Sequence, residues 1–221
     1  MRKLFILAVC LLFLTAQAYQ PPVQTLSAVP RIYLIENFLT EAECDHVISA
    51  AKDQLSRSAV VGYQSSGSGQ IHPARTSRGM FFPSNPTDPV LRAIEERIAD
   101  LTQIPVDHGE GLQILHYAVG GEYKPHYDYF NPYITGEAVH YYRGGQRIAT
   151  VIMYLNNVDE GGETIFPYVK VSVNPVKGSA LLFYNCTPDG RSDPYSLHGG
   201  SPVRKGEKWI ATKWLRMGVF H

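Results

Sequence analysis

The residues most able to do chemistry in this sequence centre on a His-x-Asp pair. His126 and Asp128 are separated by one residue, so on a β-strand both side chains would project from the same face. Two ligands placed in this way can take adjacent positions around a metal ion. A third ligand from a neighbouring strand would complete a set of two histidines and one carboxylate. That set leaves positions on the ion open for a cosubstrate and dioxygen, as non-haem Fe(II) oxygenases require.

Two downstream residues strengthen this hypothesis. His198 lies between two short β segments and is a candidate for the third ligand. Lys208 opens an apolar, aromatic strand, and a lysine that faces the interior of a barrel is costly to bury unless it meets an anion. A dicarboxylate cosubstrate would supply that anion. On spacing alone, a lysine whose ammonium reaches solvent remains the alternative.

Composition limits the classes of function. The chain has 221 residues, of which 44% are hydrophobic and 18% charged, so it has enough apolar material for a packed core and no signature of disorder. Its 20 basic and 20 acidic residues give a formal net charge of zero. Proteins that bind phosphate backbones need a basic surplus, so we expect no nucleic-acid partner.

The N-terminus is typical of a targeting segment. Met1-Arg2-Lys3 is followed by an apolar run from Leu4 to Thr15 and by the small-x-small site Ala16-Gln17-Ala18. We predict that residues 1–18 are a cleaved secretory signal and that residues 19–221 form one domain. An uncleaved N-terminal anchor is the alternative. Cleavage predicts the secretory route without stable membrane insertion: the periplasm or secretion in a bacterium, the endoplasmic reticulum or Golgi lumen in a eukaryote.

Hydrophobic periodicity predicts helices first and short strands afterwards. Helices are expected over residues 40–52, with a capping box, and over 88–101, with an Asp-Pro start. Strands are expected over residues 112–118, 147–155, 163–166, 180–184 and 208–217, and loops over 56–70 and 130–146. The fold class is therefore mainly β with N-terminal helices (α+β), with the helices packed on a sandwich or jelly roll. Whether Cys44 and Cys186 form a disulfide stays open.

Residues 30–217 carry an ordered set of motifs with a family resemblance. These include Tyr123-Lys124-Pro125-His126-Tyr127-Asp128, Gly161-Gly162-Glu163-Thr164, Ser196-Leu197-His198-Gly199-Gly200 and Gly206-Glu207-Lys208-Trp209. In order and spacing the chain resembles the prolyl 4-hydroxylases, of the 2-oxoglutarate- and Fe(II)-dependent dioxygenases, in their compact single-domain form. The resemblance implies a double-stranded β-helix (jelly-roll) core over about residues 108–217.

The resemblance also implies roles for individual residues. The iron ligands would be His126, Asp128 and His198. Lys208 would bind the far carboxylate of 2-oxoglutarate, in a pocket that Tyr117 and Thr164 line. The residues that would face or order the substrate are Arg75, Glu110, Tyr123, Arg147 and Trp214.

The activity implied is hydroxylation of peptidyl proline at C4, coupled to decarboxylation of 2-oxoglutarate to succinate. Fe(II), 2-oxoglutarate, O2 and L-ascorbate would be needed, and the partner would be a proline-containing peptide or protein. The oligomeric state is left open, and a monomer is compatible with the sequence. Three alternatives remain: the same chemistry on another side chain or a small molecule such as free proline, a non-catalytic jelly-roll binding module, and a zinc hydrolase with the same ligands.

Overall fold

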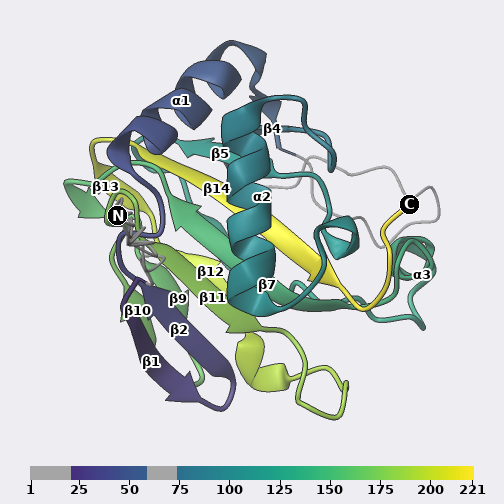
Figure 1. Cartoon of the computed structure of the whole chain (residues 1–221). Coiled ribbons are helices and arrows are strands. Elements are labelled where there is room, and N and C mark those ends of the chain that lie inside the picture. The colour runs from purple at the N-terminus through teal and green to yellow at the C-terminus, as the bar shows by residue number, and fades with distance from the viewer. Residues whose placement is uncertain (1–20, 59–73) are drawn as a thin grey trace, which may run out of the picture.

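The computed structural model describes residues 21–58 and 74–221 of the chain (Figure 1). The predicted signal, residues 1–18, and most of the predicted loop over 56–70 lie outside the described residues. The helices are α1 (Glu41–Ala51), α2 (Pro89–Thr102) and α3 (Thr135–Tyr141), with short 3-10 turns at Lys52–Gln54, Val106–His108 and Pro194–Ser196. In the described part of the chain, no helix is long and apolar enough to cross a membrane.

The larger sheet has eight strands in the order β1-β2-β11-β7-β14-β5-β4-β3, and each neighbouring pair is antiparallel. Its strands are β1 (Val23–Ala28), β2 (Arg31–Ile35), β3 (Ser56–Arg57), β4 (Arg78–Phe81), β5 (Gln113–Tyr117), β7 (Arg147–Tyr154), β11 (Ala180–Tyr184) and β14 (Lys208–Arg216). The five strands predicted from periodicity are confirmed within two residues at each end. One of them, β9 (Thr164–Phe166), belongs to the smaller sheet.

The smaller sheet pairs four strands in the order β10-β9-β12-β6, all antiparallel. Its other strands are β10 (Val171–Val173), β12 (His198–Gly200) and β6 (Tyr123–His126), and a separate two-stranded ribbon joins β8 (Glu160–Gly161) to β13 (Val203–Lys205). From β5 to β14 the chain passes repeatedly between the two sheets, which is the winding of a double-stranded β-helix. The predicted fold class is therefore confirmed.

Local sequence explains where the two long helices begin. At the start of α1, the Thr40 hydroxyl accepts from the Glu43 backbone N–H at 3.2 Å, and the Glu43 carboxylate accepts from the Thr40 N–H at 2.8 Å. At the start of α2, Asp88 accepts from the Val90 N–H at 2.8 Å, and Pro89 occupies the first helical position. Each side chain satisfies backbone donors that the first helical turn leaves unpaired. Both predicted starts are confirmed.

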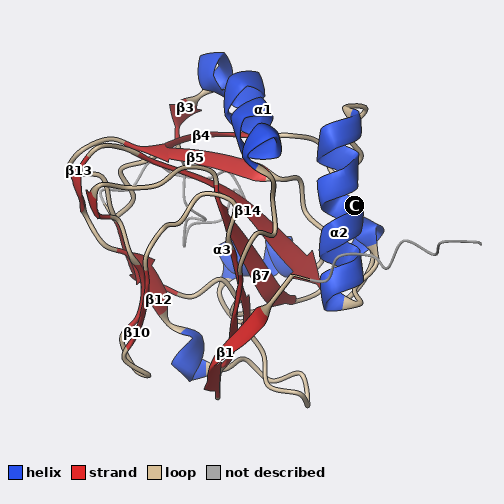
Figure 2. Ribbon diagram, turned by 60° about the vertical axis from the view of Figure 1, so that its left-hand side comes forward, coloured by secondary structure: helices blue, strands red, loops and turns tan. Residues whose placement is uncertain are grey.

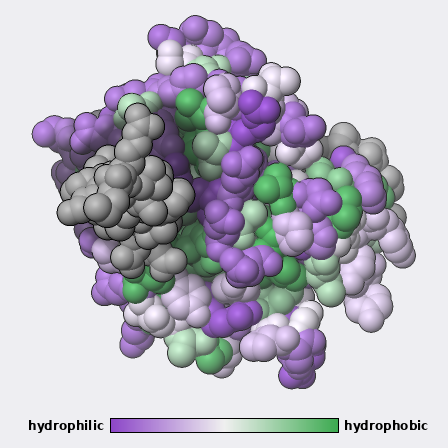
Figure 3. Space-filling view, viewed as in Figure 1, coloured by the Kyte–Doolittle hydropathy of each residue, from purple (hydrophilic) through white to green (hydrophobic). Residues whose placement is uncertain are grey.

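Strand alternation divides the interior into two cores. One face of β7 packs under α1 and α2 and contributes Ala149, Val151 and Met153. The other face points between the two sheets, where Ile152 and Tyr154 pack with aromatic residues such as Phe166 and Phe183. Figure 2 shows both helices on the same side of the larger sheet. Figure 3 shows a hydrophilic band down the outward face of α2, as expected for a helix with one buried stripe.

The β1–β2 hairpin and helix α3 are among the elements that the periodicity did not predict. The β1–β2 hairpin forms the edge of the larger sheet, and β1 is mostly exposed, so it lacks the apolar alternation that reveals a strand. Helix α3 lies inside the segment 130–146 that was expected to be a loop, and its N-cap makes no side-chain hydrogen bond. Cys44 and Cys186 are both buried and free, so they form no disulfide.

Candidate metal centre and cosubstrate pocket

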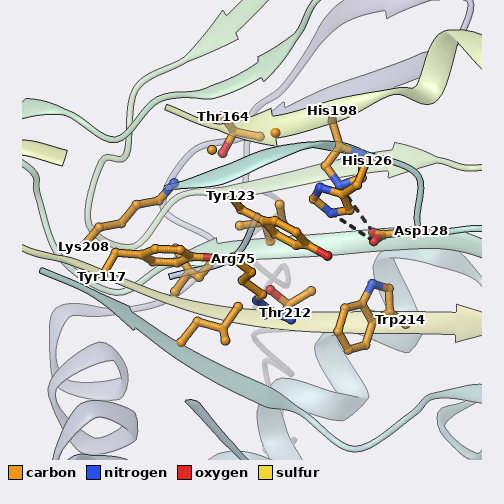
Figure 4. Close-up of a pocket in the computed structure, with 15 residues that line it drawn as sticks. Arg75, Tyr117, Tyr123, His126, Asp128, Thr164, His198, Lys208, Thr212 and Trp214 are labelled. Atoms are coloured by element: carbon orange, nitrogen blue, oxygen red, sulfur yellow. Dashed lines mark ion pairs between the residues drawn. The ribbon is translucent and has the colours of Figure 1, made fainter. Parts of the chain in front are cut away.

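Two neighbouring strands of the smaller sheet bring the predicted metal ligands together. His126 ends β6, Asp128 follows two residues later, and His198 opens β12 directly opposite His126 in the strand register. Their ligand atoms all lie within 4.8 Å of one another. Asp128 Oδ1 is 3.6 Å from His126 Nε2, and Asp128 Oδ2 is 3.5 Å from His198 Nε2 (Figure 4).

The glycines after His198 allow this close approach of strands. A Cβ atom placed on Gly199 would lie 2.9 Å from the Tyr123 carbonyl oxygen, and backbone cannot move aside as a flexible side chain can. Any other residue at 199 would push β12 away from β6 and separate the two histidines. The Gly-Gly pair is therefore part of how the sequence builds the metal centre.

Hydrogen bonds to the backbone orient both imidazoles. His126 Nδ1 lies 2.9 Å from the Lys124 carbonyl oxygen, and His198 Nδ1 lies 2.9 Å from the Ser196 carbonyl oxygen. Because a carbonyl can only accept, each Nδ1 carries the proton and each Nε2 is left with a free lone pair. Burial lowers the pKa of His198 to about 4, so its imidazole is neutral near pH 7. Neutral imidazole is the form that binds metals.

Asp128 is buried and ionised. Burial by itself would raise its pKa, but His198 and His126, whenever either ring takes a proton on Nε2, and the more distant Arg147 outweigh that effect and hold the pKa well below the usual value. The Thr150 hydroxyl donates a hydrogen bond to Asp128 Oδ2 at 2.7 Å. Two imidazole nitrogens and one carboxylate oxygen form the donor set of the 2-His-1-carboxylate facial triad, so the residues present fit a ferrous ion.

The three ligands line one end of a pocket between the two sheets. The pocket encloses about 430 Å³, including the solvent at its mouth. Its walls combine aliphatic, aromatic and polar groups: Arg75, Leu115, Tyr117, Tyr123, Ile152, Thr164, Gly199, Gly200, Lys208, Ile210, Thr212 and Trp214, together with the three ligands. Lys208, Ile210, Thr212 and Trp214 alternate along β14, which explains why one strand contributes four of them.

Lys208 is a buried cation in this pocket. It is 4% exposed, so the interpretation of a lysine that reaches solvent is wrong. Its ammonium lies 5.8 Å from the ring centroids of Tyr117 and Tyr154, and no carboxylate in the described residues forms an ion pair with it. Burial lowers its pKa to about 8, and Glu163 partly offsets that effect. A buried ammonium without an ion-pair partner favours an anionic ligand.

The two residues predicted to line the cosubstrate site both line the pocket that contains Lys208. Tyr117 pairs with Lys208 across β5 and β14, and Thr164 lies at the start of β9. The Thr164 hydroxyl accepts a hydrogen bond from the Tyr154 hydroxyl at 2.8 Å, so its own proton is available to a ligand. Tyr154 was not singled out from the sequence. The strand alternation that places Ile152 inward could have identified it.

Three of the five predicted substrate residues line the same pocket: Arg75, Tyr123 and Trp214. The Arg75 guanidinium donates to Gln113 Oε1 at 2.9 Å and lies 4.8 Å from the centroid of the Tyr123 ring. On the other face of the Tyr123 ring, the imidazole of His126 stacks with 3.6 Å between ring centroids. Burial raises the pKa of Tyr123 to about 12, so its hydroxyl stays protonated near the metal site.

The other two, Glu110 and Arg147, are not among the lining residues. They pair with each other, with Arg147 Nη2 2.8 Å from Glu110 Oε2, and Arg216 lies 2.8 Å from the same carboxylate. The Arg147 guanidinium stacks 3.8 Å from the centroid of the Trp214 ring. The structure therefore uses these two side chains to support a residue that lines the pocket. Any direct contact of theirs with substrate stays a prediction.

Comparisons with known proteins agree with this site. A family model described as the 2OG-Fe(II) oxygenase superfamily matches residues 112–216. The chain is 46% identical over 217 residues to prolyl 4-hydroxylase 5 of Arabidopsis thaliana, covering 90% of this chain and 72% of that protein. It is similar to the solved structure of a viral collagen prolyl hydroxylase from Paramecium bursaria Chlorella virus 1, a 2OG complex, with a TM-score of 0.64, 29% identity, and coverage of 84% of this chain and 95% of that one.

A more distant solved structure shares the fold. It is a prolyl hydroxylase from Trichoplax adhaerens in complex with a hypoxia inducible factor peptide fragment, with a TM-score of 0.59 and 17% identity, covering 84% of this chain and 83% of that one. The sequence similarity to the plant enzymes, the match to the family model and the assembled ligand set agree. The chain therefore belongs to the prolyl 4-hydroxylase family of Fe(II)- and 2-oxoglutarate-dependent dioxygenases.

Proposed function

We propose that this enzyme hydroxylates prolyl residues at C4 within peptide chains. One oxygen atom of O2 would become the new hydroxyl group, and the other would enter succinate as 2-oxoglutarate loses carbon dioxide. One observation carries the proposal: the cluster of His126, Asp128 and His198 and the buried Lys208 line the same pocket. When bound, Fe(II) would supply the activation of dioxygen that couples decarboxylation to C–H hydroxylation.

The side chains at one end of the pocket would bind the metal ion, and those at the other end would bind 2-oxoglutarate. His126, Asp128 and His198 would hold the ion with their free Nε2 and carboxylate atoms. Lys208 would pair with the distal carboxylate of 2-oxoglutarate, because it is a buried cation of the pocket and burial favours a partner of opposite charge.

Two pocket-lining residues support the cosubstrate site. The Thr164 hydroxyl would donate to a carboxylate of 2-oxoglutarate, since its acceptor side is already used by Tyr154. Tyr117 lies across the strand pair from Lys208 and would cover the same carboxylate.

The peptide would approach where Arg75, Tyr123 and Trp214 line the pocket. Aromatic side chains of this kind suit extended proline-rich chains, whose rings pack against flat surfaces. The Glu110–Arg147 pair would order Trp214 by stacking on its ring. L-ascorbate would act as the reductant that keeps the metal ferrous after turnovers uncoupled from hydroxylation.

We also propose that the enzyme acts on the secretory route. The cationic start, the apolar run and the Ala16-Gln17-Ala18 site support a cleaved signal over residues 1–18. The domain would then work in a periplasm or outside the cell in a bacterium, or in the endoplasmic reticulum or Golgi lumen in a eukaryote. N-terminal sequencing of the secreted product, with a start at Tyr19, tests the cleavage site.

Mass spectrometry of a panel of proline-rich peptides tests the activity. The peptides are incubated with the chain starting at Tyr19, Fe(II), 2-oxoglutarate, ascorbate and air, with the His126→Ala variant as the matched control. One added oxygen per modified proline, absent from the control, is the expected result, and fragmentation with hydroxyproline standards assigns it to C4.

Other results of the same assay point to the alternatives. Succinate formed without peptide oxidation would keep the dioxygenase and reject the peptides, which directs the search to other side chains or small molecules. No succinate from a chain that binds Fe(II) would favour a binding module. Peptide hydroxylation retained in His126→Ala would refute the ligand assignment.

A further inference from the structure

A chain of hydrogen bonds lies behind the metal centre and ends on one of its ligands. The Asn185 side-chain amide nitrogen donates to Thr150 Oγ1 at 2.9 Å, and the Thr150 hydroxyl donates to Asp128 Oδ2 at 2.7 Å. Thr150 and Asn185 both have no exposed surface. Neither residue was assigned a role from the sequence, and neither lines the pocket.

The direction of this chain is determined by its donors. The Asn185 NH2 group can only donate, so the Thr150 oxygen accepts a hydrogen bond from it. The hydroxyl has a single proton, which it donates in a hydrogen bond to Asp128. If the amide were turned round, the hydroxyl would donate to Asn185 Oδ1 instead. The ionised Asp128 oxygen would then face oxygen lone pairs with no donor, which is costly in a buried site. The order of donors therefore directs one hydrogen bond to one oxygen of the Asp128 carboxylate.

The backbone holds both residues in place. Thr150 pairs with Phe183 in the β7–β11 register. The Asn185 N–H donates to the Ile148 carbonyl at 2.9 Å, and the Asn185 carbonyl accepts from the Asp193 N–H at 2.9 Å. Asn185 Oδ1, by contrast, is buried and has no hydrogen-bond partner among the described residues. The protein thus contains a buried amide whose NH2 group is hydrogen-bonded and whose oxygen is not, although an unsatisfied buried acceptor costs free energy.

We propose that Thr150 and Asn185 are positioning residues that make Asp128 a one-oxygen metal ligand. The Thr150 hydroxyl donates to Oδ2, while Oδ1 lies 3.6 Å from His126 Nε2, beyond hydrogen-bond distance, and keeps its lone pairs for the ion. A carboxylate free on both oxygens can rotate or bind through both of them, which would consume a position that the facial triad leaves open. The inference rests on the iron site of the proposed function, but not on the identity of the peptide.

Fe(II) affinity measured without oxygen tests the inference directly. Thr150→Val keeps the shape of the side chain and removes the proton donor, so the dissociation constant for Fe(II) should rise about 10- to 100-fold. Thr150→Ser restores the hydroxyl and should bind Fe(II) nearly as the wild type does. Thr102→Val is the matched control, because Thr102 is also buried and its hydroxyl donates to the Ile98 carbonyl at 2.8 Å within α2, away from the metal centre. Its affinity should not change.

A spectroscopic readout separates positioning from a general loss of structure. The visible charge-transfer band of the anaerobic Fe(II)–2-oxoglutarate complex depends on the ligand field, so it should shift or weaken in Thr150→Val and be retained in Thr150→Ser and Thr102→Val. Asn185→Ala provides a second variant. It frees the Thr150 hydroxyl to rotate and should raise the Fe(II) dissociation constant several-fold, whether or not Thr150→Val folds.

The outcomes that overturn the inference are distinct from failure of the proposed function. Wild-type affinity and an unchanged band in folded Thr150→Val, or unchanged affinity in Asn185→Ala, would remove the positioning role while the enzyme assignment stands. A wild-type chain that binds no Fe(II) would overturn both.

Discussion

Raising the pH from 7 to 9 should weaken 2-oxoglutarate binding through Lys208. The ammonium is buried, its pKa is lowered to about 8 by burial, and Glu163 is the acidic group that partly offsets this effect. Below pH 8 the lysine is protonated and can pair with a carboxylate. Above it, the free enzyme loses the proton and the cosubstrate must restore it on binding. Affinity is therefore highest on the acid side of this range and falls as the pH rises.

The magnitude follows from the same pKa. With a pKa of about 8, roughly nine lysines in ten are protonated at pH 7 and roughly one in ten at pH 9. If only the protonated form binds, the apparent dissociation constant rises about tenfold between these two pH values, which corresponds to about 1.4 kcal/mol. The metal ligand His198, with a pKa of about 4, stays neutral across the range and does not contribute to the change.

Direct binding of 2-oxoglutarate to the anaerobic, metal-loaded enzyme at pH 7, 8 and 9 checks this prediction. Lys208→Arg is the matched control, because a guanidinium remains protonated throughout and should give a flat profile. Lys208→Met should bind weakly at every pH. Wild-type affinity that stays constant from pH 7 to 9, or an equal slope in Lys208→Met, would refute the assignment of the titration to Lys208.

Three other substitutions probe the supports of the site and of the fold. Arg147→Lys should raise the KM for a peptide several-fold and leave the KM for 2-oxoglutarate unchanged, because an ammonium cannot stack on Trp214 as the guanidinium does at 3.8 Å; an equal rise in both constants would contradict this. Lys213→Met should lower the free energy of unfolding in urea by about 3–5 kcal/mol, since it strands the carboxylate of Glu95, which is 3% exposed; a loss under about 1 kcal/mol would argue against it. Thr40→Ala removes the N-cap of α1 and should cost about 1 kcal/mol, visible as a lower Tm; an unchanged Tm would mean that the cap adds nothing.

Much of the fold could be predicted from local patterns. The two long helices start where their capping residues stand, and β11 runs over Ala180–Tyr184 as its uninterrupted apolar run predicts. Elements without such patterns were missed. The β1 strand is held by pairing with β2 at the sheet edge, and α3 has no capping hydrogen bond from its N-cap side chain. Their structure depends on neighbours that the local sequence does not specify.

The candidate site was predictable to the extent that its chemistry requires particular residue types. A His-x-Asp pair, a later histidine and a lysine at the start of an apolar strand identified four residues, and all four lie in one pocket. The sequence could not assign Glu110 and Arg147, because a charged residue serves equally well as a substrate contact or as a partner in a buried ion pair. The structure pairs them with each other.

The residue types and their spacing identified the chemistry available to this protein: two imidazoles and a lysine on strands, and a carboxylate two residues beyond the end of β6. Tertiary structure alone decided how these groups act together. The register that sets His198 against His126, the burial that lowers the pKa of Lys208, and the hydroxyl that Thr150 gives to Asp128 all arise between strands far apart in the chain. Hydrogen bonds and desolvation depend on distance in space, and only the folded sheets bring these distances within range.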